Sequence, residues 1–205
     1  MRRIYYEGLT PQIDLWTSEF GDAYTDRNIY DYKICLPAMR AMLERLELDS
    51  ILEIGSNYGG KLRALHDINP QWKLLGIEPN RHARQLAQDK WPDIPIVEAT
   101  IFNNPLPSNS FDLSFTANVL QHIALRDLPR AIGQIYRISS RYILTIEYYA
   151  YQETEILYCG NHNALWKRDW MKHFLSLFPT LRLLRTGFWD KNDGFDDSNW
   201  WLWEK

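Results

Sequence analysis

The sequence predicts a single α/β domain built on a mostly parallel sheet with helices on both faces. Up to residue 147, short apolar runs alternate with longer segments in which apolar residues recur every three or four positions. Strands that alternate with helices are joined by right-handed crossovers, which produce a parallel sheet. A turn with three glycines, residues 53–60, also lies between a strand-like run and a helix-like run. The 205 residues, 45% of them hydrophobic, suffice for one core.

The first half of the chain supplies three of the predicted strands. Helical periodicity over 32–48 predicts a helix, whereas the run at 50–55 is too short for one and fits a strand buried on both faces. The next predicted elements, in order, are a helix at 60–69 that stops before Pro70, a strand at 72–78, a helix at 80–91 with Asn80 as its N-cap, and a strand at 94–99.

The second half continues the alternation and then departs from it. A strand at 111–117, a helix at 125–139 and a strand at 141–147 are predicted. Residues 148–166 are aromatic and polar without helical periodicity, so we expect an excursion beside the ligand site. A helix at 167–178 and strands at 181–189 and 198–205 follow, the two strands joined by an acidic loop. Apolar residues on both faces of the final strand, Trp200 to Trp203, place it inside the sheet.

Composition excludes several classes of protein. Net charge is −3 and the basic residues are scattered, which argues against a nucleic-acid partner. No segment is long and uncharged enough to span a bilayer, so we expect a cytoplasmic protein with no membrane association. Cys35 and Cys159 are expected to be reduced, packed thiols, and no metal site is expected. Residues 190–197 lack the pattern of a calcium loop and predict a solvated hairpin loop.

The glycine turn indicates which kind of ligand the domain binds. Asn57 occupies the position at which a dinucleotide fingerprint has its second glycine, and Glu53 would repel a pyrophosphate. S-adenosylmethionine carries an ammonium and a sulfonium but no phosphate, so it suits an acidic strand end. Glu53 would serve the ammonium, and Glu78, at the end of the next strand, the ribose hydroxyls. The alternative is that Glu53 caps a helix and Glu78 is a solvated strand end.

The stretches "LEIGSNYGG", "GIEPN" and "FDLSFTANVLQHI" together resemble the class I S-adenosylmethionine-dependent methyltransferases over residues 48–147. The resemblance implies a Rossmann-like fold whose seven-stranded, mostly parallel sheet has an antiparallel last strand. It also implies an N-terminal lid and helix (1–48), a cofactor-binding core (49–147), an acceptor-site excursion (148–170) and a closing helix and strand hairpin (171–205). From the residues and the resemblance together, the expected cofactor-binding residues are Tyr24, Arg27, Glu53, Gly55, Ser56, Asn57, Tyr58, Gly59, Glu78, Pro79, Ala99, Thr100, Ile101, Asn118 and Val119.

Roles within this set follow from methyl-transfer chemistry. The aromatic rings of Tyr24 and Tyr58 would shelter a sulfonium. Arg27 would clamp the methionine carboxylate, or else form a surface ion pair with Asp22 or Asp26.

An acceptor hydroxyl or ammonium needs a base. The candidate bases are His122, Glu147 and His162, and we expect Glu147 to point into the crevice above the sheet. The alternative for His122 is that it only supports the cofactor loop or packs on a helix. The residues expected to bind the acceptor are Tyr148, Tyr149, Tyr158 and Asn163.

A narrower resemblance lies outside the core. "LWTSEFGDAYTDRN", "YCGNHNALWKRDW" and "DDSNWWLWEK" are similar to small methyltransferases associated with pseudaminic acid biosynthesis, which implies a sugar or another polar small molecule as acceptor. The leading hypothesis is therefore methyl transfer to oxygen or nitrogen of a sugar-like or amino-acid-like molecule, in a natural-product or surface-glycan pathway. The alternatives are a catalytically silent binding protein of the same fold and a dehydrogenase, the latter opposed by Asn57.

Overall fold

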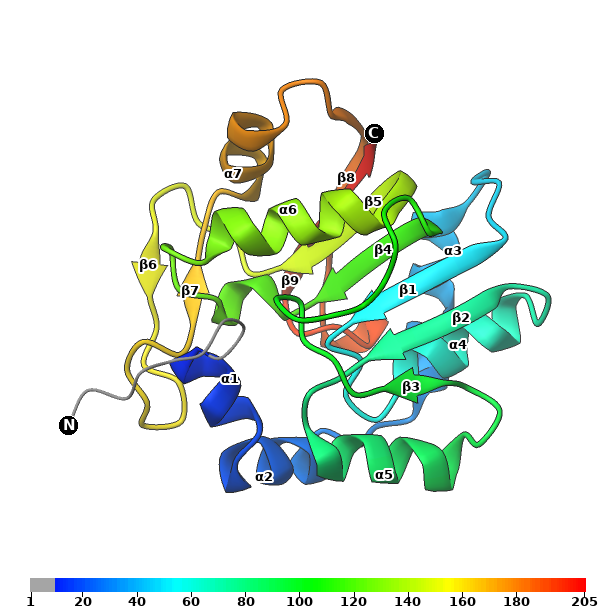
Figure 1. Ribbon diagram of the computed structural model, residues 1–205, viewed down its shortest axis with the longest axis horizontal. Coiled ribbons are helices and arrows are strands. Elements are labelled where there is room, and N and C mark those ends of the chain that lie inside the picture. Colours follow the sequence, from blue (N-terminus) through cyan, green and yellow to red (C-terminus); the bar gives the residue numbers. More distant parts are fainter. Residues whose placement is uncertain (1–9) are drawn as a thin grey trace.

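The computed structural model describes residues 10–205, which form one seven-stranded sheet with helices on both faces (Figure 1). The strands are β1 (Ser50–Ile54), β2 (Lys73–Ile77), β3 (Ile96–Val97), β4 (Phe111–Ala117), β5 (Ser139–Glu147), β8 (Arg182–Trp189) and β9 (Ser198–Glu204). Their order is β3-β2-β1-β4-β5-β9-β8, and β9 alone runs antiparallel to its neighbours in this sheet. The predicted fold class is confirmed.

Helices on both faces explain why the central strands are apolar on both sides. Ile51 of β1 packs in the core under α3 (Leu36–Leu43) and α4 (Gly60–Ile68), whereas its neighbour Leu52 packs in the core under α6 (Leu128–Ile138) and α7 (Trp170–Leu177). In β9, Trp200 packs in the first of these cores and Trp201 in the second. The strand lies between β5 and β8, so its predicted position inside the sheet is confirmed. The helix between β2 and β3, α5 (Arg81–Lys90), lies beside β3 (Figure 1).

Two predicted elements are shorter than expected. The helix predicted for 32–48 is a 3₁₀ turn, η1 (Tyr32–Cys35), followed by α3, which ends at Leu43. The Arg185 guanidinium donates to the carbonyls of Ala41 and Glu44 at 3.3 and 2.7 Å, which satisfies carbonyls that a longer helix would have bonded internally. The strand predicted for 94–99 contains only β3, because Pro95 has no N–H to donate to a ladder.

The segment after β5 leaves the sheet, as predicted, and contains a small hairpin of β6 (Thr154–Glu155) and β7 (Trp166–Lys167). Arg168, just after this hairpin, is fully buried and donates to Glu153 at 2.8 Å. Of the two free cysteines Cys35 is buried but Cys159 is exposed, so the expectation of two packed thiols is wrong for Cys159. Within residues 10–205 no helix is both long and apolar enough to cross a membrane.

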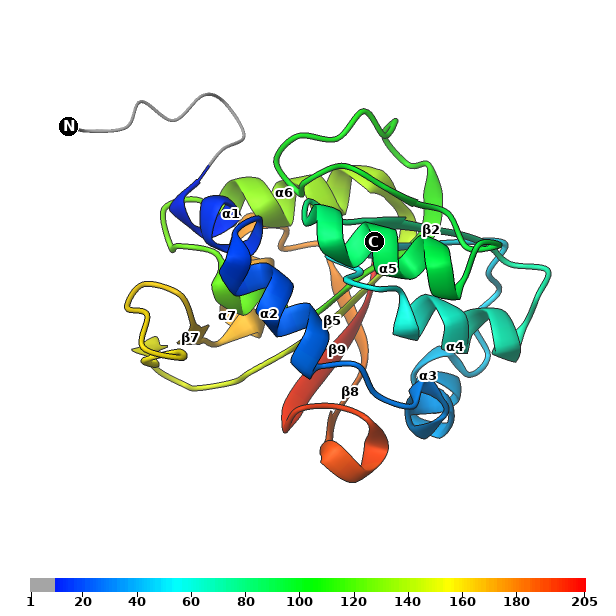
Figure 2. The ribbon, with the colours of Figure 1, turned by 90° about the horizontal axis from the view of Figure 1, so that it is seen from below.

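Two short helices precede the sheet in the chain and lie at the ends to which the parallel strands point. These are α1 (Pro11–Trp16) and α2 (Glu19–Arg27), and Figures 1 and 2 show them across that end of the sheet. Thr10 caps α1 and Ser18 caps α2 with their side-chain oxygens. The first nine residues of the predicted N-terminal lid lie outside the described residues.

Candidate functional site

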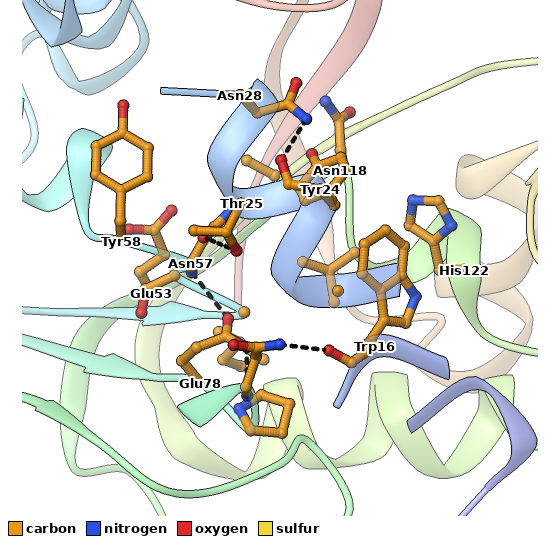
Figure 3. Close-up of a pocket in the computed structure, with 18 of the residues that line it drawn as sticks. Trp16, Tyr24, Thr25, Asn28, Glu53, Asn57, Tyr58, Glu78, Asn118 and His122 are labelled. Carbon is orange, nitrogen blue, oxygen red and sulfur yellow. Dashed lines mark hydrogen bonds between the residues drawn. The ribbon is translucent and has the colours of Figure 1, made fainter. Parts of the chain in front are cut away.

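A cavity of about 450 Å³ lies at the carboxyl ends of β1, β2 and β4, covered by α1 and α2 and bounded by the loop between β8 and β9. Figure 3 shows Glu53, Asn57 and Glu78 on one side of it and Trp16 and His122 on the other. Thirteen of the residues predicted to bind the cofactor line this cavity: Tyr24, Glu53, Gly55, Ser56, Asn57, Tyr58, Glu78, Pro79, Ala99, Thr100, Ile101, Asn118 and Val119.

The glycine turn is held in a conformation that few residues adopt. Gly55 has a φ of 72° and donates its N–H to the Ile77 carbonyl at 2.8 Å, which ties the end of β1 to the end of β2. A Cβ at Gly55 would come within 2.6 Å of Val119, so glycine is required there. Asn57 also has a positive φ, 49°, which asparagine tolerates better than most residues. Its side-chain oxygen accepts a hydrogen bond from Thr25 of α2 at 2.9 Å, which links the turn to the cover.

Glu53 is a buried carboxyl for which residues 10–205 supply no hydrogen-bond or ion-pair partner. Its side chain is 2% exposed, lines the cavity, and one of its oxygens is buried without a hydrogen bond among the described residues. Burial raises the pKa of Glu53 to about 8, against a smaller opposing effect of Lys61. The helix-cap alternative is wrong, because α4 has Gly59 at its N-cap. Such a carboxyl is stabilised when a cationic donor enters the cavity.

Glu78 is 7% exposed and is anchored by backbone N–H groups. Its Oε2 accepts from Asn57 N and its Oε1 from Asn80 N, each at 2.8 Å. Burial raises the pKa of Glu78, and these two hydrogen bonds oppose the rise. The alternative of a solvated strand end is therefore wrong, and each oxygen keeps a lone pair for a ligand hydroxyl.

His122 lies in η2 (Leu120–His122), directly after β4, and lines the cavity. Its Nδ1 is 2.6 Å from the Ala164 carbonyl, which can only accept, so Nδ1 carries the proton and Nε2 has the lone pair. Burial is the main cause that lowers the pKa of His122 to about 4, so the ring is neutral at pH 7. The Trp16 ring meets it edge-on, with the ring centroids 4.6 Å apart.

The other two predicted bases lie outside the cavity. Glu147 is fully buried, and its oxygens accept the backbone N–H groups of Val119, Leu120 and Gln121 at 3.2, 3.0 and 3.2 Å. The expectation that it points into the crevice is wrong, since it instead holds the turn that carries His122. His162 is exposed, 3.3 Å from Glu155, and does not line the cavity.

Arg27 and Gly59 are the two predicted cofactor-binding residues that do not line the cavity. The Arg27 guanidinium lies over the rings of Phe20 and Tyr24, 5.6 and 5.4 Å from their centroids. No ion pair joins Arg27 to Asp22 or Asp26, its predicted alternative partners. Asp22 instead accepts a hydrogen bond from Asn80, and Asp26 pairs with His82. Gly59 has a φ of 81° and is the N-cap residue of α4.

The predicted acceptor-binding residues surround the site without lining it. Tyr148 donates its hydroxyl to Asp196, a cavity residue, and Tyr158 packs against Trp16 and His122. The carbonyl of Asn163 accepts from Gln12 at 3.0 Å, whereas Tyr149 is exposed. None of these four side chains lines the cavity, and their role in acceptor binding stays a prediction.

Other cavity residues were not predicted from the sequence: among them are Gln12, Trp16, Thr25, Tyr30, Lys61, Lys191, Phe195 and Asp196. The last three belong to the loop expected to be solvated. Lys191 and Asp196 are indeed exposed, but Phe195 is buried and brings the loop to the edge of the cavity. Of these residues, Lys61 could have been found from the sequence, because it lies just beyond the glycine turn, eight residues after Glu53. No group of three or more His, Cys, Asp or Glu side chains within residues 10–205 is arranged to hold a metal.

Comparisons with known proteins agree with this geometry. A family model described as a methyltransferase domain matches residues 52–141. An uncharacterized methyltransferase of Oceanobacillus iheyensis is 24% identical over 125 residues, which are 60% of this chain and 58% of that protein. The chain thus spans less than two thirds of the length of that curated relative.

Two solved structures show the likeness of the fold. Phosphoethanolamine N-methyltransferase 1 of Haemonchus contortus, solved with phosphoethanolamine and S-adenosylhomocysteine, has 14% identity and a TM-score of 0.73, covering 98% of this chain and 51% of that one. The 1,6-didemethyltoxoflavin-N1-methyltransferase of Burkholderia thailandensis has 11% identity and a TM-score of 0.68, covering 96% and 91%. The chain therefore has the Rossmann-like fold of these two methyltransferases, and its residues 52–141 match the family model of a methyltransferase domain.

Proposed function

We propose that this protein is an S-adenosylmethionine-dependent methyltransferase that methylates oxygen or nitrogen of a polar small molecule. The observation that carries the proposal is the pair Glu53 and Glu78, two buried carboxyls that line one cavity at the ends of adjacent parallel strands. The acceptor would be sugar-like or amino-acid-like, in a natural-product or surface-glycan pathway.

The cavity fits the proposed cofactor better than it fits a dinucleotide. Its volume of about 450 Å³ suits one cofactor and a small acceptor. A phosphate group near Glu53 would be repelled by the ionised carboxylate, with little screening by water, whereas an ammonium would form an ion pair with that carboxylate. Glu78 can accept from ribose hydroxyls, and Ala99, Thr100 and Ile101 line the part of the cavity proposed for the adenine.

The cofactor, when bound, supplies an electrophilic methyl group on a sulfonium. The protein's own contribution is to hold an acceptor in line with that methyl group and to exclude water under α1 and α2. Trp16 and Tyr24 contribute aromatic surface to the cavity. His122 would accept the proton that an acceptor O–H or N–H loses, since Nε2 has a lone pair and the ring is neutral at pH 7.

The small size of the cavity supports a small acceptor. Its lining comes mainly from the ends of central strands and from the helices that cover them, and its volume of about 450 Å³ leaves room for only a small acceptor beside the cofactor. The two structural neighbours described above are named for small-molecule acceptors, phosphoethanolamine and 1,6-didemethyltoxoflavin. The narrower resemblance of residues 15–28, 158–170 and 196–205 to methyltransferases of pseudaminic acid clusters favours a sugar-like molecule.

Incubation with methyl-labelled S-adenosylmethionine and separate pools of amino sugars, amino acids and small amines tests the proposal. We expect label in one or more small molecules from the wild-type protein and none from Glu53→Gln. Label only in protein or RNA would contradict the acceptor class. Tight cofactor binding without transfer to any pool would instead support the catalytically silent alternative.

A further inference from the structure

Lys61 is a cationic residue that lines the cavity. It is the second residue of α4, and its ammonium lies 5.9 Å from the centroid of the Tyr30 ring and 5.8 Å from that of Phe195. All three side chains line the cavity. Among residues 10–205 no carboxylate forms an ion pair with Lys61, although the chain is rich in acidic residues.

The position of Lys61 on its helix favours an anion beside it. The first turn of a helix carries a partial positive charge, so a lysine ammonium there is repelled and an anion is attracted. The two aromatic faces offer only weak stabilisation at these distances. A ligand anion in the cavity would remove the repulsion and would also meet the free N–H groups of the helix start.

Glu53 is a second ionisable side chain that lines the cavity and has no ion-pair partner among residues 10–205. It is 2% exposed, and Lys61 is the strongest influence that opposes the rise of its pKa, so the two side chains are electrostatic neighbours. No ion pair joins them directly. A ligand that binds both would carry a positive and a negative group close together, as an α-amino acid does with its ammonium and carboxylate on one carbon atom.

We propose that Lys61 binds the carboxylate at the amino-acid end of the cofactor while Glu53 binds its ammonium. The inference rests on the proposed function and assigns to Lys61 the task that sequence analysis gave to Arg27. Arg27 is exposed outside the cavity and interacts with Phe20, Tyr24 and Cys159 instead. An anionic group of an acceptor is the weaker candidate for Lys61, because it would lie beside Glu53 with no positive charge of its own to balance that carboxylate.

Calorimetry with two ligands separates this role from a general effect on the cavity. S-adenosylhomocysteine has the amino-acid end, and 5′-methylthioadenosine lacks it. We expect Lys61→Met to weaken S-adenosylhomocysteine binding about ten- to a hundredfold, the usual effect of losing a charge-assisted hydrogen bond, with 5′-methylthioadenosine binding unchanged. Lys61→Arg should recover most of the affinity. Lys73→Met, an exposed lysine at the opposite end of β2, is the matched control.

Two results would overturn the assignment. Lys61→Met could bind S-adenosylhomocysteine as tightly as the wild type, or it could weaken both ligands equally, which would indicate a structural role. A wild-type protein that binds neither ligand would remove the proposed function itself, so the two failures are distinguishable.

Discussion

Glu53→Gln should stabilise the ligand-free protein while it weakens cofactor binding. The wild-type carboxyl is buried without a partner, so its ionisation in the folded state is unfavourable. Glutamine has nearly the same shape and carries no charge at any pH. The substitution therefore removes the cost of the buried charge and also removes the group proposed to hold the cofactor ammonium.

The size of the effect follows from the pKa of Glu53, which rises from 4.5 to about 8 on folding. Below pH 4.5 Glu53 is protonated in both the folded and the unfolded protein, so its burial does not reduce the stability of the fold. As pH rises from 4.5 to 8 the unfolded chain releases the proton and the folded chain keeps it, so wild-type stability falls across this window. At about 1.36 kcal/mol per pH unit, the full cost above pH 8 is about 5 kcal/mol. Glu53→Gln should then raise Tm by roughly 10 °C at pH 8.

Thermal unfolding at pH 5 and pH 8 measures this difference. At pH 5 the wild type and Glu53→Gln should have nearly equal stability, and the gap should open in favour of the variant at pH 8. Glu47→Gln is the control, since that side chain is 91% exposed and its substitution should open no such gap. A gap that is independent of pH, or a less stable variant at pH 8, would refute the buried, uncompensated ionisation of Glu53.

Glu78→Ala should weaken S-adenosylhomocysteine about tenfold or more, measured by calorimetry, because it removes the proposed ribose contact and leaves the N–H groups of Asn57 and Asn80 without an acceptor. Unchanged affinity would show that the ribose lies elsewhere. His122→Ala should lower the single-turnover rate about 10²- to 10⁴-fold with little change in cofactor affinity. In the wild type, whose His122 pKa is about 4, the rate should show no inflection near 6.5; a full rate in the variant would exclude proton transfer.

The features that sequence predicted well depend on local signals. The glycine turn, the strand ends that carry Glu53 and Glu78, and the capping role of Asn80 all follow from residues that are neighbours in the chain. Apolar residues on both faces of the last strand likewise placed it within the sheet. These elements form most of the floor of the cavity, which is why thirteen of its lining residues could be predicted from the sequence.

The cover of the cavity could not be predicted in the same way. Trp16 and Phe195 reach the site because α1 and the β8–β9 loop lie over the strand ends. Neither segment has a sequence pattern that predicts this position. The expectation for Glu147 failed for a different reason. The rule that strand-end carboxylates face the crevice ignores the N–H groups of the turn after β4, which capture this carboxylate. Arg27 shows that charge alone does not place a side chain in a cavity.

Titration calorimetry of the wild-type protein with S-adenosylhomocysteine and with NAD tests the central claim most directly. The cavity contains two buried carboxyls and the unpartnered Lys61, so we expect the first ligand to bind and NAD, with its pyrophosphate, to give no measurable heat. Tight binding of NAD with no binding of S-adenosylhomocysteine would contradict the account.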